Sequence, residues 1–333
     1  MCHLLRRRIT ALHLLLLGVI GGSGIACAAA EQRPQFWAFT GPWDPRSDSS
    51  VSAHGTKLDA VISGWITIDS LTGQPVLPSP YPDTVRPREG AVRRLAIVTS
   101  WHGDRFHRAP IELLARDAQA LGSAAGGLAA YAAAQRYDGL VFDFETLEAA
   151  DLEAHVEVLR ALADSARAIG VGTIAVAIPA TDTAAYPVRP LLAIADALIV
   201  MLYDQHWLSS GPGPIASPAW VQHWLNRRIA EAGPERLIAG LPLYGYRWQA
   251  RQPTEPVTFS EAAAYAEGTG VPLRRDSASR TLRSVAPDGA ETWVTDAALL
   301  RVLVDAARKA GVHRFALWRL GQEDPAIWGT VIR

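Results

Sequence analysis

Cysteine is scarce in this chain of 333 residues: Cys2 and Cys27 are the only two. A surplus of charge of either sign is also lacking, because 32 Lys and Arg residues face 33 Asp and Glu residues. The near-neutral balance gives no broad positive field and excludes a general nucleic-acid-binding surface. With 49% hydrophobic and 20% charged residues, the chain is too apolar to be disordered. These features leave a globular protein with an ample core.

Both cysteines lie in a stretch that is typical of an export signal. Residues 6–8 are three arginines, residues 9–20 are mostly apolar, and residues 28–30 are the small residues that a signal peptidase prefers. We expect cleavage after Ala30, which leaves 29 basic against 33 acidic residues, a net charge of -4. The mature chain, residues 31–333, then has no cysteine, so its stability cannot come from disulfides.

Two alternatives to cleavage after Ala30 remain open. The sequence that ends in Cys27 resembles a lipobox, so a lipoprotein anchored through that residue is the closer rival. A membrane anchor is the weaker one, because a spanning helix needs about 20 apolar residues and this run ends in glycines. With a cleaved signal or a lipid anchor at Cys27, we expect an exported protein, periplasmic or secreted, with no transmembrane segment in its mature form.

Apolar runs bounded by Gly, Pro and Asp alternate with amphipathic patterns, which is typical of βα units. Eight strands interleaved with helices over about 300 residues predict a (β/α)8 TIM barrel, a fold that takes roughly 250 residues. The expected strands are Gln35–Thr40, Leu58–Ile68, Leu95–Ser100, Gly139–Glu145, Gly172–Ile178, Ala197–Tyr203, Leu237–Tyr244 and Arg314–Leu320. The expected helices are Pro110–Leu121, Gly127–Gln135, Leu152–Ala168, Ala219–Ala232 and Asp296–Ala310.

Two segments depart from a regular barrel. The proline-rich residues 68–95 show no helical pattern, which predicts an irregular second βα unit. Residues 249–292 are too long for a loop and contain a helical pattern at Phe259–Glu267 and a short strand at Thr281–Val285. We interpret them as a small α+β insertion between the seventh strand and its helix, because neither segment could bury a core of its own.

The candidate chemistry lies on the fourth strand, where Asp143 and Glu145 follow an apolar run. The two-residue period of a strand places both acids on the face of Val141, toward the barrel interior. Active sites of such barrels lie at the carboxyl ends of the strands. Two carboxylates there repel each other and lose hydration, which raises one pKa and makes that residue a candidate general acid. A cap on the following helix is the structural alternative.

Residues 138–145 resemble the Asp-Gly-x-Asp-x-Asp-x-Glu signature of glycoside hydrolase family 18, the chitinase-like enzymes. Residues 201–204, 241–245 and 316–319 resemble the same family in the same order, so the likeness spans nearly the whole mature chain. The loop 211–216 and the ending 318–325 are most similar to the bacterial branch that acts on peptidoglycan or exopolysaccharides.

The resemblance implies a role for each matched residue. Glu145 would protonate the glycosidic oxygen and later activate water, while the substrate's own acetamido group attacks the sugar, an exception to the two-carboxylate scheme. Asp143 would orient that group, and Tyr203 would hydrogen-bond it. The substrate-binding residues would be Asp204, which faces sugar hydroxyls, Met201 beside it on the strand, Trp318 as the floor and Tyr244 as the wall.

The family's first acid is replaced here by Val141, so Asp143 has no inner acid with which to share a proton. We expect this to leave Asp143 ionised more of the time. Trp101, Trp207 and Trp248 follow strand ends, where flat aromatic faces could stack on sugars.

His102 and His107 lack the further ligands of a metal site, and no phosphate-binding or dinucleotide motif is found. We therefore expect no metal and no cofactor.

These observations predict an exported glycosidase that cleaves β-linked N-acetylglucosamine-containing glycans with retention, acts as a monomer and binds an N-acetylated polysaccharide such as peptidoglycan, chitin or an exopolysaccharide. A lectin-like barrel that binds glycans without cutting them is the alternative; the presence of Glu145 argues against it and Val141 keeps it open. A metal-dependent barrel hydrolase is a third reading, which predicts loss of activity with chelators.

Overall fold

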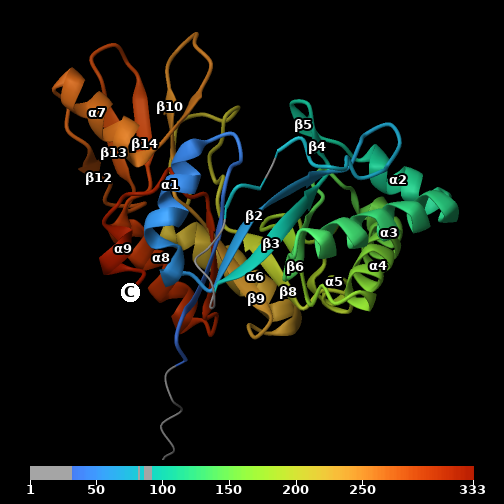
Figure 1. The fold of residues 1–333 in the computed structure, drawn as a ribbon. Helices are drawn as coiled ribbons and strands as arrows, with labels where there is room; N and C mark the ends of the chain where they lie inside the picture. Colours follow the sequence, from blue (N-terminus) through green and yellow to red (C-terminus); the bar gives the residue numbers. More distant parts are fainter. Residues whose placement is uncertain (1–31, 82, 86–91) are drawn as a thin grey trace, which may run out of the picture. The chain divides into compact units, whose positions relative to one another are not determined.

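Eight parallel strands close into a barrel in a computed structural model that describes residues 32–81, 83–85 and 92–333 (Figure 1). The order around the barrel is β1-β15-β9-β8-β7-β6-β3-β2, and Arg33–Arg333 forms one compact unit. The predicted TIM barrel is confirmed. Its strands are β1 Gln35–Phe39, β2 Ala60–Thr67, β3 Arg93–Thr99, β6 Gly139–Asp143, β7 Thr173–Pro179, β8 Ala197–Met201, β9 Leu237–Pro242 and β15 Arg314–Trp318.

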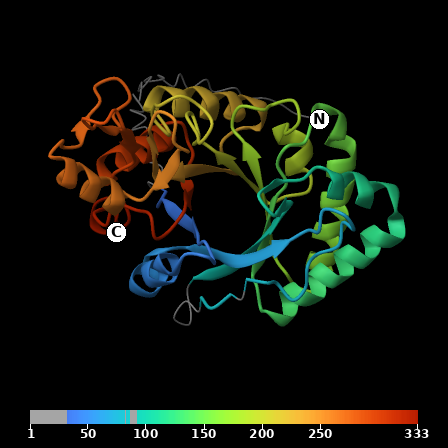
Figure 2. The ribbon, with the colours of Figure 1, turned by 90° about the horizontal axis from the view of Figure 1, so that it is seen from above.

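Each barrel strand is buried because it packs on both of its faces. One face of the strands forms the interior cluster, which includes Trp37, Ile97 and Val141. The other face, with Leu140 and Phe142 on β6, packs against the surrounding helices. Figure 2 shows the strands enclosed by these helices. Because both faces are buried, the sequence of each strand is a nearly continuous apolar run, which made the strands predictable.

The helices follow the strands around the barrel. They are α1 Pro45–His54, α2 Ala109–Arg116, α3 Ala118–Ala134, α4 Leu152–Ala168, α5 Val188–Leu192, α6 Pro218–Ala232, α8 Ala297–Lys309 and α9 Ile327–Thr330. Three of them, α1, α5 and α9, were not predicted. Helix α1 was not predicted, since its buried face contains Ser47, Ser50 and Val51 and so lacks an apolar stripe. The short α5 also carried too little pattern to be seen.

The boundary between α2 and α3 was also misplaced. Asp117 has extended backbone, and its side chain accepts hydrogen bonds from the N–H groups of Gln119 and Ala120. It therefore ends α2 and caps α3, whereas the predicted break lay near residue 122–126. The two neighbouring glycines at 126 and 127 stay helical because the alanine-rich sequence around them favours a helix, even though each glycine costs about 1 kcal/mol.

No helix connects β2 to β3 in the part of the chain that the structure describes, as the proline-rich sequence predicted. A two-stranded hairpin, β4 Trp101–His102 and β5 Arg105–Phe106, follows β3. In the described residues no helix is long and apolar enough to cross a membrane. The predicted signal and Cys27 lie outside the described residues.

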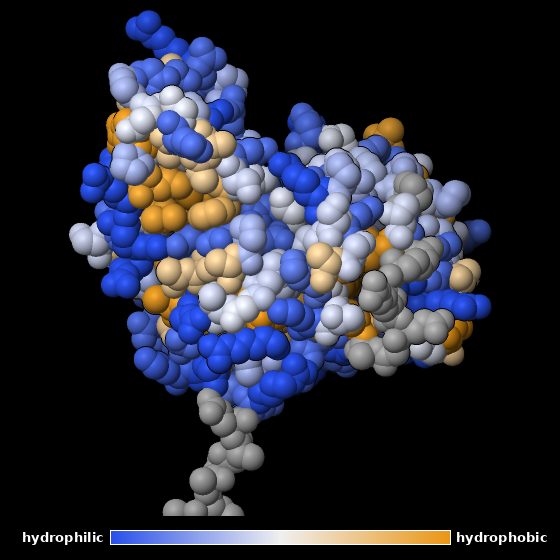
Figure 3. All heavy atoms as spheres, turned by 60° about the vertical axis from the view of Figure 1, so that its left-hand side comes forward, coloured by the Kyte–Doolittle hydropathy of each residue, from blue (hydrophilic) through white to orange (hydrophobic). Residues whose placement is uncertain are grey.

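The insertion after the seventh barrel strand is confirmed and is larger than expected. It forms a five-stranded antiparallel sheet in the order β11-β10-β14-β13-β12, with α7 packed against it. Figure 3 shows hydrophobic residues gathered on the side of the molecule that carries it. Its elements are β10 Gly245–Trp248, β11 Glu255–Val257, α7 Phe259–Thr269, β12 Arg274–Arg275, β13 Leu282–Val285 and β14 Glu291–Val294.

Candidate active site

A cleft of about 510 Å³ opens at the carboxyl ends of the barrel strands. Acids, tyrosines and tryptophans from six of the strands and their loops line it. Those that the sequence predicted are Asp143, Glu145, Met201, Tyr203, Asp204, Trp318 and Trp101. The structure therefore brings seven of the nine predicted site residues into one cleft.

The two acids enter the cleft from the end of β6. Asp143 is the last residue of the strand and is 6% exposed, and Glu145 lies two residues beyond it. Val141 lies in the barrel interior on the same face, while Phe142 and Phe144 pack toward the helices. Thr146 then has a left-handed backbone (φ 63°), uncommon for a residue other than glycine, and turns the chain away from the strand.

Burial controls the protonation of this pair. It raises the pKa of Asp143 to about 7, and one carboxylate oxygen of Asp143 has no hydrogen-bond partner. The pKa of Glu145 is raised well above its usual range by burial and by the charges of Asp143 and Asp204. Glu145 therefore keeps a proton near neutral pH, as a general acid must. Burial also opposes our expectation that the absence of an inner acid leaves Asp143 more ionised.

Tyr203 and Met201 reach the cleft from the end of β8, and Asp204 follows them with a left-handed backbone (φ 56°). The Tyr244 hydroxyl donates to Asp204 Oδ1, and the Tyr246 hydroxyl donates to the same oxygen at 3.4 Å. Burial raises the pKa of Asp204, and these two hydrogen bonds partly lower it. The two tyrosines thus hold the Asp204 carboxylate in place.

Trp318 and Trp101 supply aromatic surface at two places in the cleft. Trp318 ends β15 and contacts Phe39 edge to face, with ring centroids 5.2 Å apart. Trp101 is 38% exposed on the β4–β5 hairpin and contacts Phe106 edge to face at 5.1 Å. The peptide bond that follows Trp318 is cis. Both rings are available to a ligand in the cleft.

Tyr244 and Trp248 do not line the cleft, which corrects their expected place in its wall. Tyr244 is 4% exposed, and its hydroxyl donates a hydrogen bond to Asp204. Trp248 is 6% exposed, because β10 turns into the antiparallel sheet of the insertion and packs the indole beside Tyr246. Trp207 is 48% exposed but is not among the lining residues either. A position after a barrel strand therefore did not suffice to place these side chains.

Sequence reasoning missed an aromatic cluster on the opposite flank of the cleft. Trp43, Trp65 and Tyr81 line the cleft and contact one another edge to face, with centroids 4.9 to 6.5 Å apart. Trp43 follows β1, and Trp65 lies near the end of β2. Their placement at strand ends could have identified these two tryptophans as candidate site residues. Tyr81 had no such signal, because it lies in the irregular proline-rich connection.

Comparisons with known proteins find similarity to a glycosylase, a cortex-lytic enzyme and a chitinase. No protein-family model matches the sequence. The chain is 34% identical over 131 residues to YdhD of Bacillus subtilis (strain 168), a protein named provisionally as a sporulation-specific glycosylase; the match covers 38% of this chain and 31% of that protein. The structure matches the Bacillus cereus spore cortex-lytic enzyme SleL with a TM-score of 0.79 and 19% identity, over 91% of this chain and 74% of that one.

A family 18 chitinase from Cycas revoluta, solved in complex with (GlcNAc)4, matches with a TM-score of 0.75 and 19% identity, over 90% of this chain and 98% of that one. The chain has the barrel fold of the glycoside hydrolase family 18 chitinases. The predicted resemblance is thereby confirmed. The chain spans less than two thirds of the length of the curated relatives that it matches.

In this family 18-like barrel, one further residue that the sequence did not reveal holds the acid's loop. The Tyr186 hydroxyl donates to the Phe144 carbonyl at 2.8 Å and accepts from the Leu147 N–H at 3.1 Å. Tyr186 is 1% exposed and packs against the buried His155. It therefore fixes the backbone on both sides of Glu145. Only the folded chain brings this tyrosine, from the β7–α5 connection, to the end of β6.

We expect Tyr186→Phe to lower kcat on a glycan substrate more than it raises KM, because Glu145 loses its fixed backbone while the substrate contacts remain. The two unpaired backbone groups should also cost about 1–3 kcal/mol of unfolding free energy. Steady-state kinetics and urea unfolding measure the two effects. Tyr131→Phe, a change on α3, is the matched control. An unchanged kcat with reduced stability would show that Tyr186 is structural only.

His102 and His107 lie on or beside the β4–β5 hairpin, with ring centroids 6.2 Å apart. The Ser70 hydroxyl lies 3.1 Å from His102 Nδ1, and His107 Nε2 lies 3.0 Å from the His102 carbonyl oxygen. Across residues 32–81, 83–85 and 92–333, no group of three or more His, Cys, Asp and Glu residues could hold a metal ion. The two histidines have the contacts of polar loop residues.

Proposed function

We propose that this chain is a retaining glycosidase that cleaves β-linked N-acetylglucosamine-containing glycans with help from the substrate's own acetamido group. The observation that carries the proposal is the convergence of Asp143, Glu145 and Tyr203 in one aromatic-walled cleft. The raised pKa of Glu145 favours a protonated acid at neutral pH. The glycosylase, cortex-lytic and chitinase names of the similar proteins point to the same substrate class.

Each residue then has a defined task in the reaction. Glu145 donates its proton to the glycosidic oxygen as the bond to the leaving sugar breaks. The acetamido oxygen attacks C1 from the other face and forms a cyclic oxazolinium ion, and Glu145 then takes a proton from the water that opens it. Asp143 and Tyr203 hold the acetamido group, and the Asp143 carboxylate stabilises the positive charge. Asp204 binds sugar hydroxyls, and Trp318 stacks on the reacting sugar.

The test compares N-acetylated glycans with a deacetylated one. Peptidoglycan, chitin oligomers and poly-N-acetylglucosamine are incubated with the enzyme, and NMR records the anomer of the first product. We expect β-anomeric products from at least one N-acetylated glycan and no cleavage of a fully deacetylated glucosamine oligomer, which lacks the acetamido nucleophile. Inverted products, or equal cleavage of the deacetylated oligomer, would contradict the mechanism. Binding without any cleavage would support the lectin-like alternative.

We also propose that the protein is exported by the signal in residues 1–30, since its polysaccharide substrates lie outside the cytoplasm. The basic, apolar and small-residue segments of that stretch support this. Mass spectrometry of the protein from its native host distinguishes the outcomes: a chain that begins at residue 31 indicates cleavage after Ala30, and a lipid-modified Cys27 indicates a lipoprotein. A full-length chain that begins at Met1 would contradict both.

A further inference from the structure

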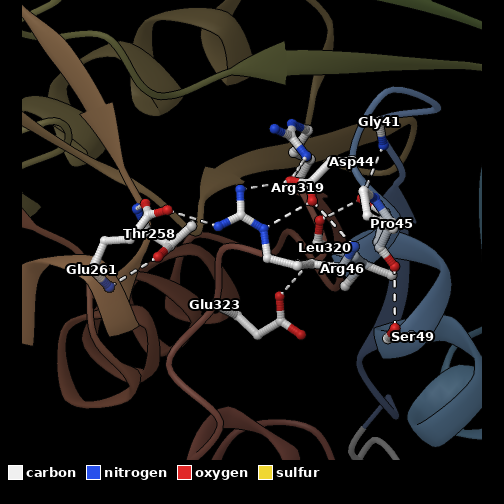
Figure 4. Close-up of polar contacts among 12 residues, drawn as sticks. Gly41, Asp44, Pro45, Arg46, Ser49, Thr258, Glu261, Arg319, Leu320 and Glu323 are labelled. Carbon is white, nitrogen blue, oxygen red and sulfur yellow. Dashed lines mark hydrogen bonds and ion pairs between the residues drawn. The ribbon is translucent and has the colours of Figure 1, made fainter. Parts of the chain in front are cut away.

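Asp44 connects the floor of the cleft to its aromatic flank. Asp44 is the N-cap of α1, and its carboxylate lies between two guanidinium groups, which Figure 4 shows. Arg319 Nη1 donates to Asp44 Oδ2 at 2.8 Å, and Arg46 Nε donates to Oδ1 at 2.8 Å. Arg46 also reaches Glu261 at the start of α7 at 2.8 Å. The network therefore joins β15, α1 and the insertion.

The Arg319–Asp44 pair is deeply buried, which makes its position well defined. Arg319 is 9% exposed and Asp44 is 5% exposed. Burial raises the pKa of Asp44, but the hydrogen bonds from Arg46 and Arg319 outweigh it and hold that pKa below its usual range. Asp44 thus stays charged near neutral pH. A buried ion pair of this kind contributes geometry more clearly than stability.

The same guanidinium supports Trp43. Arg319 Cζ lies 5.5 Å from the centre of the Trp43 ring, a cation–π distance, while half of Trp43 remains exposed (50%) at the cleft. Gly41 makes room for this arrangement, since a Cβ at that position would lie 2.8 Å from Arg319 Nη1. Arg319 directly follows the floor residue Trp318, so one segment presents one aromatic ring to the cleft and fixes another.

Trp43 and Glu145 enter the cleft from different parts of the barrel wall. It follows β1, whereas Glu145 follows β6, and β2 and β3 lie between them. Three strand steps of about 4.8 Å each separate the two positions along the barrel wall. A glycan that reaches Trp43 from Glu145 must therefore be longer than the minimal substrate.

We propose that Arg319, held by Asp44, is a positioning residue that fixes the Trp43 indole as a stacking surface for a distant sugar and so selects long glycan chains over short ones. This inference rests on the proposed glycosidase function. Trp43 touches the glycan, and Arg319 acts only through it.

The test compares cleavage of a six-unit N-acetylglucosamine oligomer with cleavage of a two-unit chromogenic glycoside. We expect Trp43→Ala to lower kcat/KM on the six-unit chain by about tenfold through KM, and to leave the two-unit substrate unchanged. Arg319→Met should reproduce this pattern, Arg319→Lys should restore part of the activity, and the double variant should lose no more than Trp43→Ala alone. Asp44→Asn, which keeps a good helix cap, tests the pair if Arg319→Met does not fold.

Arg275→Met is the matched control, because it removes a similar ion pair between an arginine and the N-cap Asp296 of α8, with no tryptophan of the cleft involved. Arg275→Met should preserve the ratio of the kcat/KM values for the six-unit and the two-unit substrate. If the wild type cuts the oligomer but Arg319→Met keeps the wild-type ratio, the positioning role is wrong and the glycosidase proposal stands. If the wild type cuts neither substrate, the glycosidase proposal fails, and crystal structures decide the positioning role: a displaced Trp43 ring in Arg319→Met supports it, and an unmoved ring overturns it.

Discussion

Glu145→Gln lowers kcat on N-acetylated glycans by about a thousandfold or more, within the range of 10² to 10⁴ that general acid–base catalysis contributes. The amide keeps the shape of the side chain and can still donate a hydrogen bond, but it cannot transfer a proton to the leaving oxygen. The variant should therefore still bind oligosaccharides with nearly unchanged affinity. Steady-state hydrolysis and calorimetric titration with a four-unit N-acetylglucosamine oligomer measure the two quantities.

Glu148→Gln is the matched control for this change. Glu148 lies three residues further along the same loop, and its exposed carboxylate pairs with Arg108 at 2.8 Å outside the cleft. We expect it to retain most of the wild-type activity. If Glu145→Gln keeps more than a tenth of the wild-type kcat, Glu145 is not the acid, and the catalytic assignment fails even if glycans are cut.

Glu145→Gln should also change how the stability of the folded chain depends on pH. A carboxyl group whose pKa is raised on folding binds its proton more tightly in the folded chain than in the unfolded one. Stability therefore falls as pH rises from the unfolded pKa, near 4, through the folded pKa, which is about 7 for Asp143. Glu145, with its raised pKa, has the same sign. Glu145→Gln removes one such penalty, so its Tm should fall less than that of the wild type between pH 4 and pH 8.

The barrel was predictable because its strands are buried on both faces and its helices alternate with them. All eight predicted strands occur, because a run such as Leu140 to Phe144 has one set of side chains in the interior and the other against the helices. Elements with little apolar character were not predictable. Helix α1 buries serines, and the α2–α3 boundary depends on a single capping residue, Asp117.

The candidate site was predictable where one strand carries the pattern. Asp143 and Glu145 share a face of one strand end, so the period of two sufficed to bring them together. Contacts between elements were not encoded in any local pattern. Trp248 was expected at the cleft because it follows a strand end, but its strand pairs with β14 of the insertion and buries it. Tyr186 was overlooked for the converse reason, since its partners are backbone groups from another βα unit.

The largest loss of stability is expected from Arg228→Met on α6. Arg228 is fully buried, and its guanidinium donates to four backbone carbonyls of the β7–α5 connection, those of Pro179, Ala180, Asp182 and Tyr186. Burial lowers the pKa of Arg228, and the nearby Glu231 partly offsets it. Methionine fills similar space but leaves the carbonyls unpaired. We expect a loss of about 3–5 kcal/mol in unfolding free energy and a Tm lower by on the order of 10 °C.

Arg227→Met, on the exposed side of the same helix, is the matched control and should change the Tm by little. The loss at Arg228 should also reach the active site, because the carbonyl of Tyr186 is one of its acceptors and the hydroxyl of Tyr186 fixes the loop of Glu145. Below its lowered Tm, Arg228→Met should therefore show a reduced kcat at nearly constant KM, as Tyr186→Phe does. Equal Tm values for the two arginine variants would overturn the role of Arg228. A lowered Tm with wild-type kcat would show that Arg228 contributes to stability alone and that the β7–α5 connection does not affect catalysis.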